Sequence, residues 1–150
     1  MRNLYEPSTV ADLKQRIAQL TPDRPPQWGK MNAAQAVAHC ATAMEWAVGD
    51  RKPKRALVGR ILAPLVRPKV LGTDDPMRRN GPTAKELIVA DQRDLSNECQ
   101  RLAGLIDRFA TSGPANCTTH PHTFFGPMTP EQWAILCYKH LDHHLRQFGV

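Results

Sequence analysis

Apolar side chains recur every three or four residues in four stretches of the chain, which is the spacing of an amphipathic helix. These stretches predict helices over residues 8–20, 32–48, 83–110 and 129–148. No stretch alternates apolar and polar positions with β-branched residues over the length of a strand, so no sheet is expected. The pattern therefore predicts an all-α fold, a four-helix bundle that forms a single domain over residues 1–150.

Capping residues mark the ends of these predicted helices. Ser8 or Thr9 is expected to cap the first helix, and Gly49 is expected to stop the second. Thr83 and Glu86 predict a capping box at the start of the third helix. The signal is most complete before the fourth helix, which has a cap, a proline at the first position and a box partner: Thr129, Pro130 and Gln132.

A long connection between the second and third predicted helices carries the excess charge of the chain. Residues 51–80 hold nine basic and two acidic side chains, a net charge of +7, whereas the whole chain carries +6. Prolines in this segment are expected to limit any helix there to a short piece over residues 57–64. The length leaves room for a crossover, so the bundle need not run up-down-up-down.

Composition narrows the classes of function. Aromatic residues make up only 6% of the chain, which disfavours a stacking platform for single-stranded nucleic acid. No helix-turn-helix or zinc-finger spacing appears, so a nucleic-acid partner is not expected. No apolar run reaches the roughly 18 residues of a membrane span, and the N-terminus lacks the apolar core of a signal peptide. We therefore expect a cytoplasmic protein without a membrane partner, whose four cysteines are free thiols.

Candidate chemistry lies in the histidines, above all in the segment KHLDHHLRQF of the last predicted helix. His140 and His144 are spaced i, i+4, so they share one face, and two neutral imidazoles one turn apart can share a divalent ion. His39 lies on the second predicted helix, where the helical wheel leaves open whether it points inward. His143 falls nearer the edge of its helix. The alternative is a set of packed boundary histidines without metal, and the H-E-x-x-H signature is absent.

Four other residues are weaker candidates. Asp91 falls within the apolar arc of predicted helix 83–110, so it could orient a ligand histidine or become a fourth ligand. Alternatively, Asp91 forms an ion pair with an arginine at the edge of the bundle. The same two roles, at the site or in an ion pair, are open to Glu98. His120 and His122 precede the last helix and could bind substrate, the alternative being an exposed turn. Cys40 and Cys137 are expected to pack in the core.

Two segments of the chain resemble the DinB/YfiT-like superfamily: QWGKMNAAQAVAHC at 27–40 and FFGPMTPEQWAILCYKHLDHHLRQFGV at 124–150. The closer match is to a branch of small bacterial proteins that end in a similar HLDHHLRQFG segment. The resemblance implies a four-helix bundle with a long crossover between helices two and three. It also implies a three-histidine site for a divalent metal, Zn or Ni, formed by His39, His140 and His144, with His39 pointing inward.

Three neutral histidines would leave the ion its full charge and open coordination positions, which is typical of a catalytic metal. Relatives in the superfamily include thiol-dependent transferases and isomerases, so the resemblance implies a metal-dependent transferase or hydrolase acting on a small molecule. Residues 51–80 could border the site and attract an anionic substrate. The alternatives are a metal-free, non-catalytic or homodimerising bundle and, less favoured, a binder of nucleic acid or an anionic surface.

Overall fold

The computed structural model describes residues 1–150 and contains helices but no strand. Its elements in chain order are α1 (Pro7–Ile17), α2 (Ala33–Ala47), α3 (Leu57–Leu71), the 3₁₀ turn η1 (Lys85–Leu87), α4 (Leu95–Ser112), the 3₁₀ turn η2 (Pro114–Asn116) and α5 (Pro130–Gln147). The expected all-α class is confirmed, with one helix more than the four predicted. None of these helices combines the length and the apolar composition that a membrane span requires.

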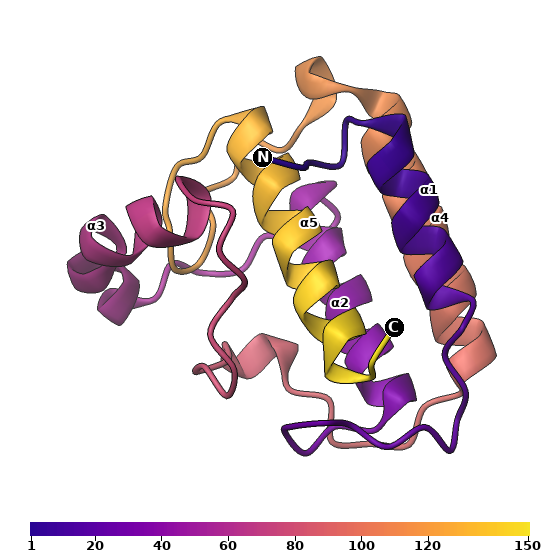
Figure 1. Cartoon of the computed structure of the whole chain (residues 1–150). Coiled ribbons are helices and arrows are strands. Elements are labelled where there is room, and N and C mark those ends of the chain that lie inside the picture. The colour runs from indigo at the N-terminus through magenta and orange to yellow at the C-terminus, as the bar shows by residue number, and fades with distance from the viewer.

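The helices pack around one main core, and α3 lies to its side (Figure 1). α2 packs against α4 and α5, and α1 lies against the same two helices. All four of these helices contribute large, fully buried side chains to this core, and the segment before α1 adds Leu4: Leu13, Met44, Leu102, Ile106 and Leu141 come from the helices. α3 packs against α5 and projects from the rest of the molecule, as Figure 1 shows.

The strongest capping signals are confirmed. The Thr129 side chain accepts the Gln132 backbone N–H at 3.2 Å, and the Gln132 side chain accepts the Thr129 backbone N–H at 3.0 Å, so α5 begins with a reciprocal box. Gly49 follows α2 with a φ of +86°, a left-handed conformation that favours glycine and ends the helix. These two boundaries fix the helices that carry the candidate histidines.

The predicted caps of α1 are wrong. The helix begins at Pro7, where the fixed φ of proline suits the first position and its missing N–H leaves no bond unmade. Thr9, proposed with Ser8 as a cap, is instead buried inside the first turn. Its hydroxyl donates to the carboxylate of Glu6 at 2.9 Å, so it supports the helix start from within.

The predicted helix 83–110 is wrong over its first part. The expected capping box of Thr83 and Glu86 does not form, because the chain makes only the single turn η1 there. The side chain of Asp94 instead accepts the Asn97 backbone N–H at 2.8 Å and starts α4. The apolar repeat misled the prediction because Ile88, which extends it by seven residues ahead of Leu95, is 63% exposed.

The prolines of the connection do not confine its helix as predicted. α3 continues past Pro64 and Pro68, which are four residues apart and both lie on the exposed side of the helix. The opposite side packs against α5, where the buried Lys139 ammonium donates to the Val70 carbonyl at 2.8 Å and to the Thr73 carbonyl at 2.9 Å. These bonds satisfy the end of α3 and tie it to α5.

Candidate metal centre

Three histidines from α2 and α5 converge inside the molecule. One ring nitrogen from each of His39, His140 and His144 lies within 4.8 Å of the other two. The ring centroids are 4.7 to 4.9 Å apart. His39 is buried, whereas the two histidines of α5 are partly exposed. The structure thus brings together the three predicted residues and turns His39 inward, the point that the helical wheel left open.

The backbone of η1 fixes the tautomer of His39. Nδ1 of His39 lies 2.8 Å from the carbonyl oxygen of Leu87. Because a carbonyl oxygen can only accept, Nδ1 carries the hydrogen and Nε2 keeps its lone pair. That Nε2 lies 2.9 Å from Nε2 of His140, so the lone pair of His39 is directed into the cluster.

The side chain of Gln147, held in turn by the Trp28 carbonyl, fixes the tautomer of His144. The Gln147 amide nitrogen donates to the Trp28 carbonyl at 2.6 Å, so the amide oxygen of Gln147 must be the atom beside His144. Nδ1 of His144 donates to that oxygen at 2.8 Å. His144 therefore also keeps a lone pair on Nε2. Partners of this kind, which hold the second ring nitrogen, are the usual support of metal-binding imidazoles.

Burial keeps the three imidazoles neutral. Loss of hydration is the largest cause that lowers the pKa of each, to about 3 for His144 and well below its ordinary value for His140. Neighbouring imidazoles lower the pKa of His140 and His144 further, while the bond to Leu87 partly opposes the shift of His39. At neutral pH all three therefore have the form that binds a metal ion.

The donor set fits a divalent transition metal. It consists of imidazole nitrogens without a carboxylate, which suits Zn, Ni or Cu better than Mg or Ca. Zinc–nitrogen bonds of about 2.0–2.1 Å place two ligand nitrogens about 3.3 Å apart in a tetrahedral site. The Nε2 atoms of His39 and His140 are already at a comparable separation, 2.9 Å. Three such ligands leave at least one coordination position for another group.

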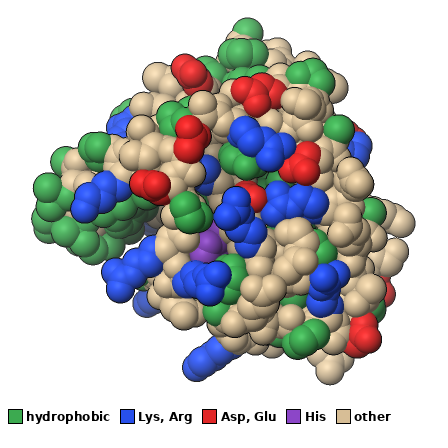
Figure 2. Space-filling view, viewed as in Figure 1, with side chains coloured by type: hydrophobic (Ala, Val, Ile, Leu, Met, Phe, Trp, Pro, Cys, Tyr) green, Lys and Arg blue, Asp and Glu red, His purple; other side chains and the backbone are tan.

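His143 lies beside the cluster but outside it. Its ring is 5.1 Å from that of His144 and 5.5 Å from that of Trp28. The guanidinium of Arg79 lies 4.0 Å from the centre of the Trp28 ring on the same side of the molecule. Figure 2 shows a histidine side chain at the surface among Lys and Arg side chains. Arg79 therefore forms a basic margin beside His143, at the edge of the cluster.

The basic connection 51–80 approaches the cluster through one end only. Arg79, near its C-terminal end, is the residue whose contacts lead through Trp28 toward the histidines. Arg51, near its N-terminal end, forms an ion pair with Glu45 of α2 at 2.5 Å. We expected the whole segment to border the site, but only its last few residues have contacts that lead to the histidines.

The acidic candidates are not part of the cluster. Asp91 was expected on a helix but lies in the loop before α4, and its 64% exposed side chain pairs with Arg93 at 3.0 Å. Glu98 is buried and pairs with Arg93 at 3.1 Å and with Arg101 at 2.9 Å. Both carboxylates therefore form ion pairs with arginines, which was the alternative to a role at the metal site.

His120 and His122 also lie outside the cluster. Nε2 of His120 is 2.9 Å from the carbonyl of Pro53, which joins the loop before α5 to the segment after α2. Nδ1 of His122 accepts two backbone N–H groups at 3.1 Å, and burial lowers its pKa to about 4. Its ring packs against Trp46 and Trp133. The expected exposed turn is wrong, because both histidines are half-buried.

The cysteines are free thiols, as predicted. Cys40 and Cys137 are buried among the apolar side chains of the main core, and burial raises the pKa of both. A thiol with a raised pKa is a weak nucleophile at neutral pH. Neither side chain belongs to the group of residues that could hold an ion together.

A polar cavity of about 380 Å³ lies beside η1. The same turn whose Leu87 carbonyl holds His39 contributes Glu86 to the wall of this cavity. Its charged lining consists of three glutamates and three arginines from α2, η1, α4 and the adjoining loops: Glu45, Glu86, Glu98, Arg51, Arg93 and Arg101. The three arginines pair with Glu45 and Glu98, and the lining carries equal numbers of positive and negative side chains, so the cavity does not favour one sign of ligand.

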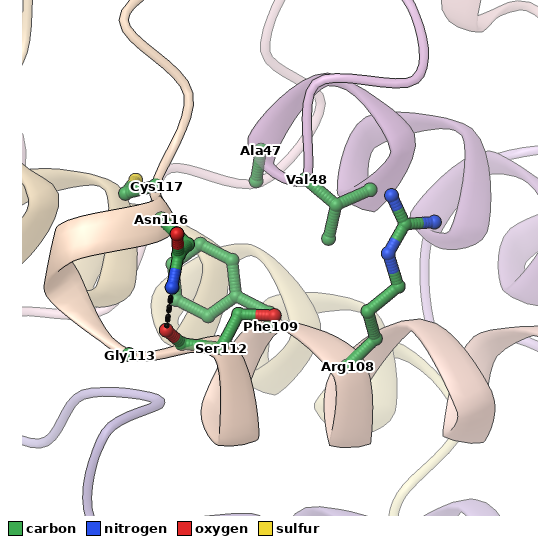
Figure 3. A pocket seen from close by; sticks show the side chains of 8 residues that line it. All are labelled: Ala47, Val48, Arg108, Phe109, Ser112, Gly113, Asn116 and Cys117. Carbon is green, nitrogen blue, oxygen red and sulfur yellow. Dashed lines mark hydrogen bonds between the residues drawn. The ribbon is translucent and has the colours of Figure 1, made fainter.

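A second cavity of about 220 Å³ lies at the C-terminal ends of α2 and α4 (Figure 3). Its one basic side chain, Arg108, is held by Asp50 at 2.6 and 2.7 Å. The dashed bond in Figure 3 runs from the Asn116 side chain to the Ser112 carbonyl at 2.9 Å. Its lining contains no histidine or carboxylate that could activate the Ser112 hydroxyl or the Cys117 thiol, so the histidine cluster is the better candidate site.

The supports of the cluster were not predicted from the sequence. Gln147 follows His144 by three residues, so its position on the same helix face was a signal that could have been found. Leu87 and Trp28 each contribute a backbone carbonyl. Every residue has one, so the sequence does not indicate which carbonyl accepts these hydrogen bonds. Both were beyond pattern analysis.

These observations define an all-helical protein with three neutral histidines converging from two of its helices. The chain belongs to the family described as "Protein of unknown function (DUF1569)", whose family model matches residues 7–149. The matched range includes all three histidines. No curated protein and no solved structure matches the chain.

Proposed function

We propose that this protein is a divalent-metal-dependent enzyme acting on a small molecule, with His39, His140 and His144 as its metal ligands. The observation that carries the proposal is the fixed direction of the ring nitrogens. Leu87 and Gln147 hold the N–H groups of two of the imidazoles, and both lone pairs remain for an ion.

We also propose that α1, α2, α4 and α5 form a four-helix bundle of the DinB/YfiT-like type. Two features support this. The ligand histidines lie on α2 and α5, the helices that carry the metal site in that resemblance. The long segment between α2 and α4 includes α3, which lies beside the other helices rather than among them. On this proposal the segment is the crossover connection of the bundle.

A bound Zn or Ni ion would supply a Lewis acid that makes a water or thiol nucleophilic at neutral pH. The residues of the chain would bind the substrate and orient it toward the ion. His39 is buried, so substrate would approach from the partly exposed side of His140 and His144. The basic margin that includes Arg79 would favour an anionic substrate. Transfer of a group to a thiol or to water, as in a transferase or hydrolase, is the proposed class of reaction.

The competing proposal is a metal-free, non-catalytic bundle. It rests on the 2.9 Å separation between Nε2 of His39 and Nε2 of His140, which is a hydrogen-bond distance. If Nε2 of His140 carries a hydrogen, it donates to His39 and closes the cluster without an ion. The two proposals therefore differ at Nε2 of His140, which carries a hydrogen in the metal-free cluster and a free lone pair in the metal site.

Metal analysis of protein purified without a histidine tag separates the two. After expression with added zinc or nickel, we expect about one ion per chain, the occupancy of a single three-histidine site. His140→Ala should lose the ion, while His120→Ala, outside the cluster, should retain it. Wild-type protein that stays metal-free, and whose thermal midpoint does not rise when either ion is added, would refute the metal site.

A further inference from the structure

α3 carries most of the large apolar side chains that the molecule exposes. Leu57 and Ile61 are each 75% exposed and Leu65 is 71% exposed. Val58 and Leu62 add exposed area beside them. Figure 2 shows the projecting part of the molecule, which Figure 1 identifies as α3, covered with hydrophobic side chains. A contiguous apolar patch of this kind usually marks an interaction site.

The apolar stripe cannot turn inward, because the other side of α3 is already packed. Leu57, Ile61 and Leu65 are spaced by four residues, so they form one stripe along the helix. On the opposite side, a Cβ added to Gly59 would lie 2.5 Å from the carbonyl oxygen of Phe124, so the helix is in close contact there. Lys139 anchors its C-terminal end. The fold therefore presents the stripe to its surroundings.

The surroundings of the stripe are strongly basic. Between residues 51 and 73 there is no acidic side chain. The basic ones, most of them exposed, lie on α3 and on the segment before it: Arg51, Lys52, Lys54, Arg55, Arg60, Arg67 and Lys69. A surface that is both apolar and basic complements a partner that is both apolar and anionic.

We propose that α3 and the basic segment before it bind the surface of an anionic lipid bilayer, in contrast to the expectation from the sequence that no membrane is a partner. In this arrangement the helix lies in the plane of the interface, with the stripe of Leu57, Ile61 and Leu65 among the acyl chains and the basic side chains among the headgroups. Its 15 residues make a helix about 22 Å long, which is too short to cross the hydrocarbon core. The proposal is independent of the histidine cluster.

Charge and apolar character together distinguish this partner from others. Pairing of α3 with α3 of a second copy would bring together two basic helices that carry no acidic side chain, so like charges would repel. A nucleic acid would match the charge but would leave the apolar stripe without a function. An anionic bilayer matches both features, with Arg60 and Lys69 positioned on the same helix as the stripe.

Co-sedimentation of the full chain with lipid vesicles tests the proposal. Vesicles of phosphatidylcholine with roughly 30% phosphatidylglycerol should bind the protein at low salt, and vesicles of phosphatidylcholine alone should bind it at least about tenfold more weakly. Raising the salt from about 0.05 M to 0.5 M should weaken the binding, because charges at the surface are screened. Absence of binding to the anionic vesicles at low salt would overturn the proposal.

Two triple variants separate the roles of the stripe and of the charges. Replacing Lys52, Lys54 and Arg60 with Gln should weaken binding about a hundredfold, since each basic side chain near an anionic surface contributes about a fivefold effect. Replacing Leu57, Ile61 and Leu65 with Ser should also weaken it at least about a hundredfold, because their apolar area leaves water on binding. All six side chains are exposed, so both variants should fold.

Matched controls come from other exposed positions. Ile88→Ser removes a 63% exposed apolar side chain outside α3, and the double variant Lys30→Gln, Lys85→Gln removes two exposed charges. Both controls should bind the anionic vesicles as wild type does. Binding that survives loss of the apolar stripe would overturn the proposal. So would a dimer, seen by gel filtration without lipid, that the Ile61→Ser substitution abolishes, since the stripe would then belong to a second copy.

Discussion

The imidazoles of the three-histidine cluster and of His122 are all partly or fully buried, yet the two sites use their ring nitrogens in opposite ways. His39 and His144 give their N–H groups to the Leu87 carbonyl and the Gln147 amide oxygen, and each keeps a lone pair. Nδ1 of His122 instead accepts two backbone N–H groups, so its lone pair is used. Burial lowers the pKa in both places. The direction of the hydrogen bonds, rather than burial, separates a candidate ligand from a packed histidine.

The largest effect expected from this comparison is the loss of a ligand. His140→Ala should weaken zinc binding by more than the roughly tenfold to hundredfold effects typical of residues that only support a ligand. His122→Asn should leave the affinity unchanged, because Nδ1 of His122 already accepts two backbone N–H groups and is not directed at the metal site. Competition titration with a chelating dye measures both constants. Equal losses in the two variants would show that the comparison is wrong.

The next effect concerns the support of a ligand. Gln147→Ala should weaken zinc binding about tenfold to a hundredfold, because His144 loses the acceptor that fixes its tautomer. Gln147→Glu keeps an acceptor for Nδ1 but sets its second oxygen against the Trp28 carbonyl, so its affinity should fall between those of the alanine variant and the wild type. The same dye titration gives both values. An alanine variant that binds zinc as tightly as wild type would remove Gln147 from the site.

Acid should destabilise the metal-free protein through its packed histidine. Burial holds the pKa of His122 at about 4, whereas an unfolded chain takes up that proton near pH 6.5, so stability falls as pH drops between these values. At pH 5 this amounts to about 2 kcal/mol. Urea unfolding in the presence of a chelator, at pH 7.5 and at pH 5, should show that His122→Asn loses less stability than wild type by about this amount. Parallel losses in the two proteins would contradict the assignment.

The smallest effect is expected at His143, which is next to His144 in the chain but outside the cluster. His143→Gln should change zinc affinity by no more than about twofold, as is usual for a substitution away from a key contact. The measurement sharpens the assignment within the HLDHH segment. A loss as large as that of His140→Ala would place His143 among the ligands.

Prediction from the sequence worked where the signal is local. The box of Thr129 and Gln132 placed the start of α5 correctly, because its two hydrogen bonds lie within one turn. The spacing of His140 and His144 on that helix followed from helix geometry alone. The convergence of His39 on them did not, because nearly every side of α2 is buried and its helical wheel shows no single inner face.

Prediction was poorest where distant packing decides the conformation. The helix expected from residue 83 is interrupted because η1 turns to pack Leu87 into the core and to offer its carbonyl to His39. α3 extends through Pro64 and Pro68 because α5 supports its far end. In both cases the partner lies about 50 or more residues away in the chain, beyond the reach of a local pattern.

The central claim is that His39, His140 and His144 bind one metal ion together, and X-ray absorption spectroscopy of the zinc-loaded protein tests it most directly. The account predicts a first shell that contains three imidazole nitrogens at about 2.0–2.1 Å, with a lighter oxygen or nitrogen ligand completing it. Fewer than three imidazoles, or sulfur at about 2.3 Å from a cysteine, would contradict it.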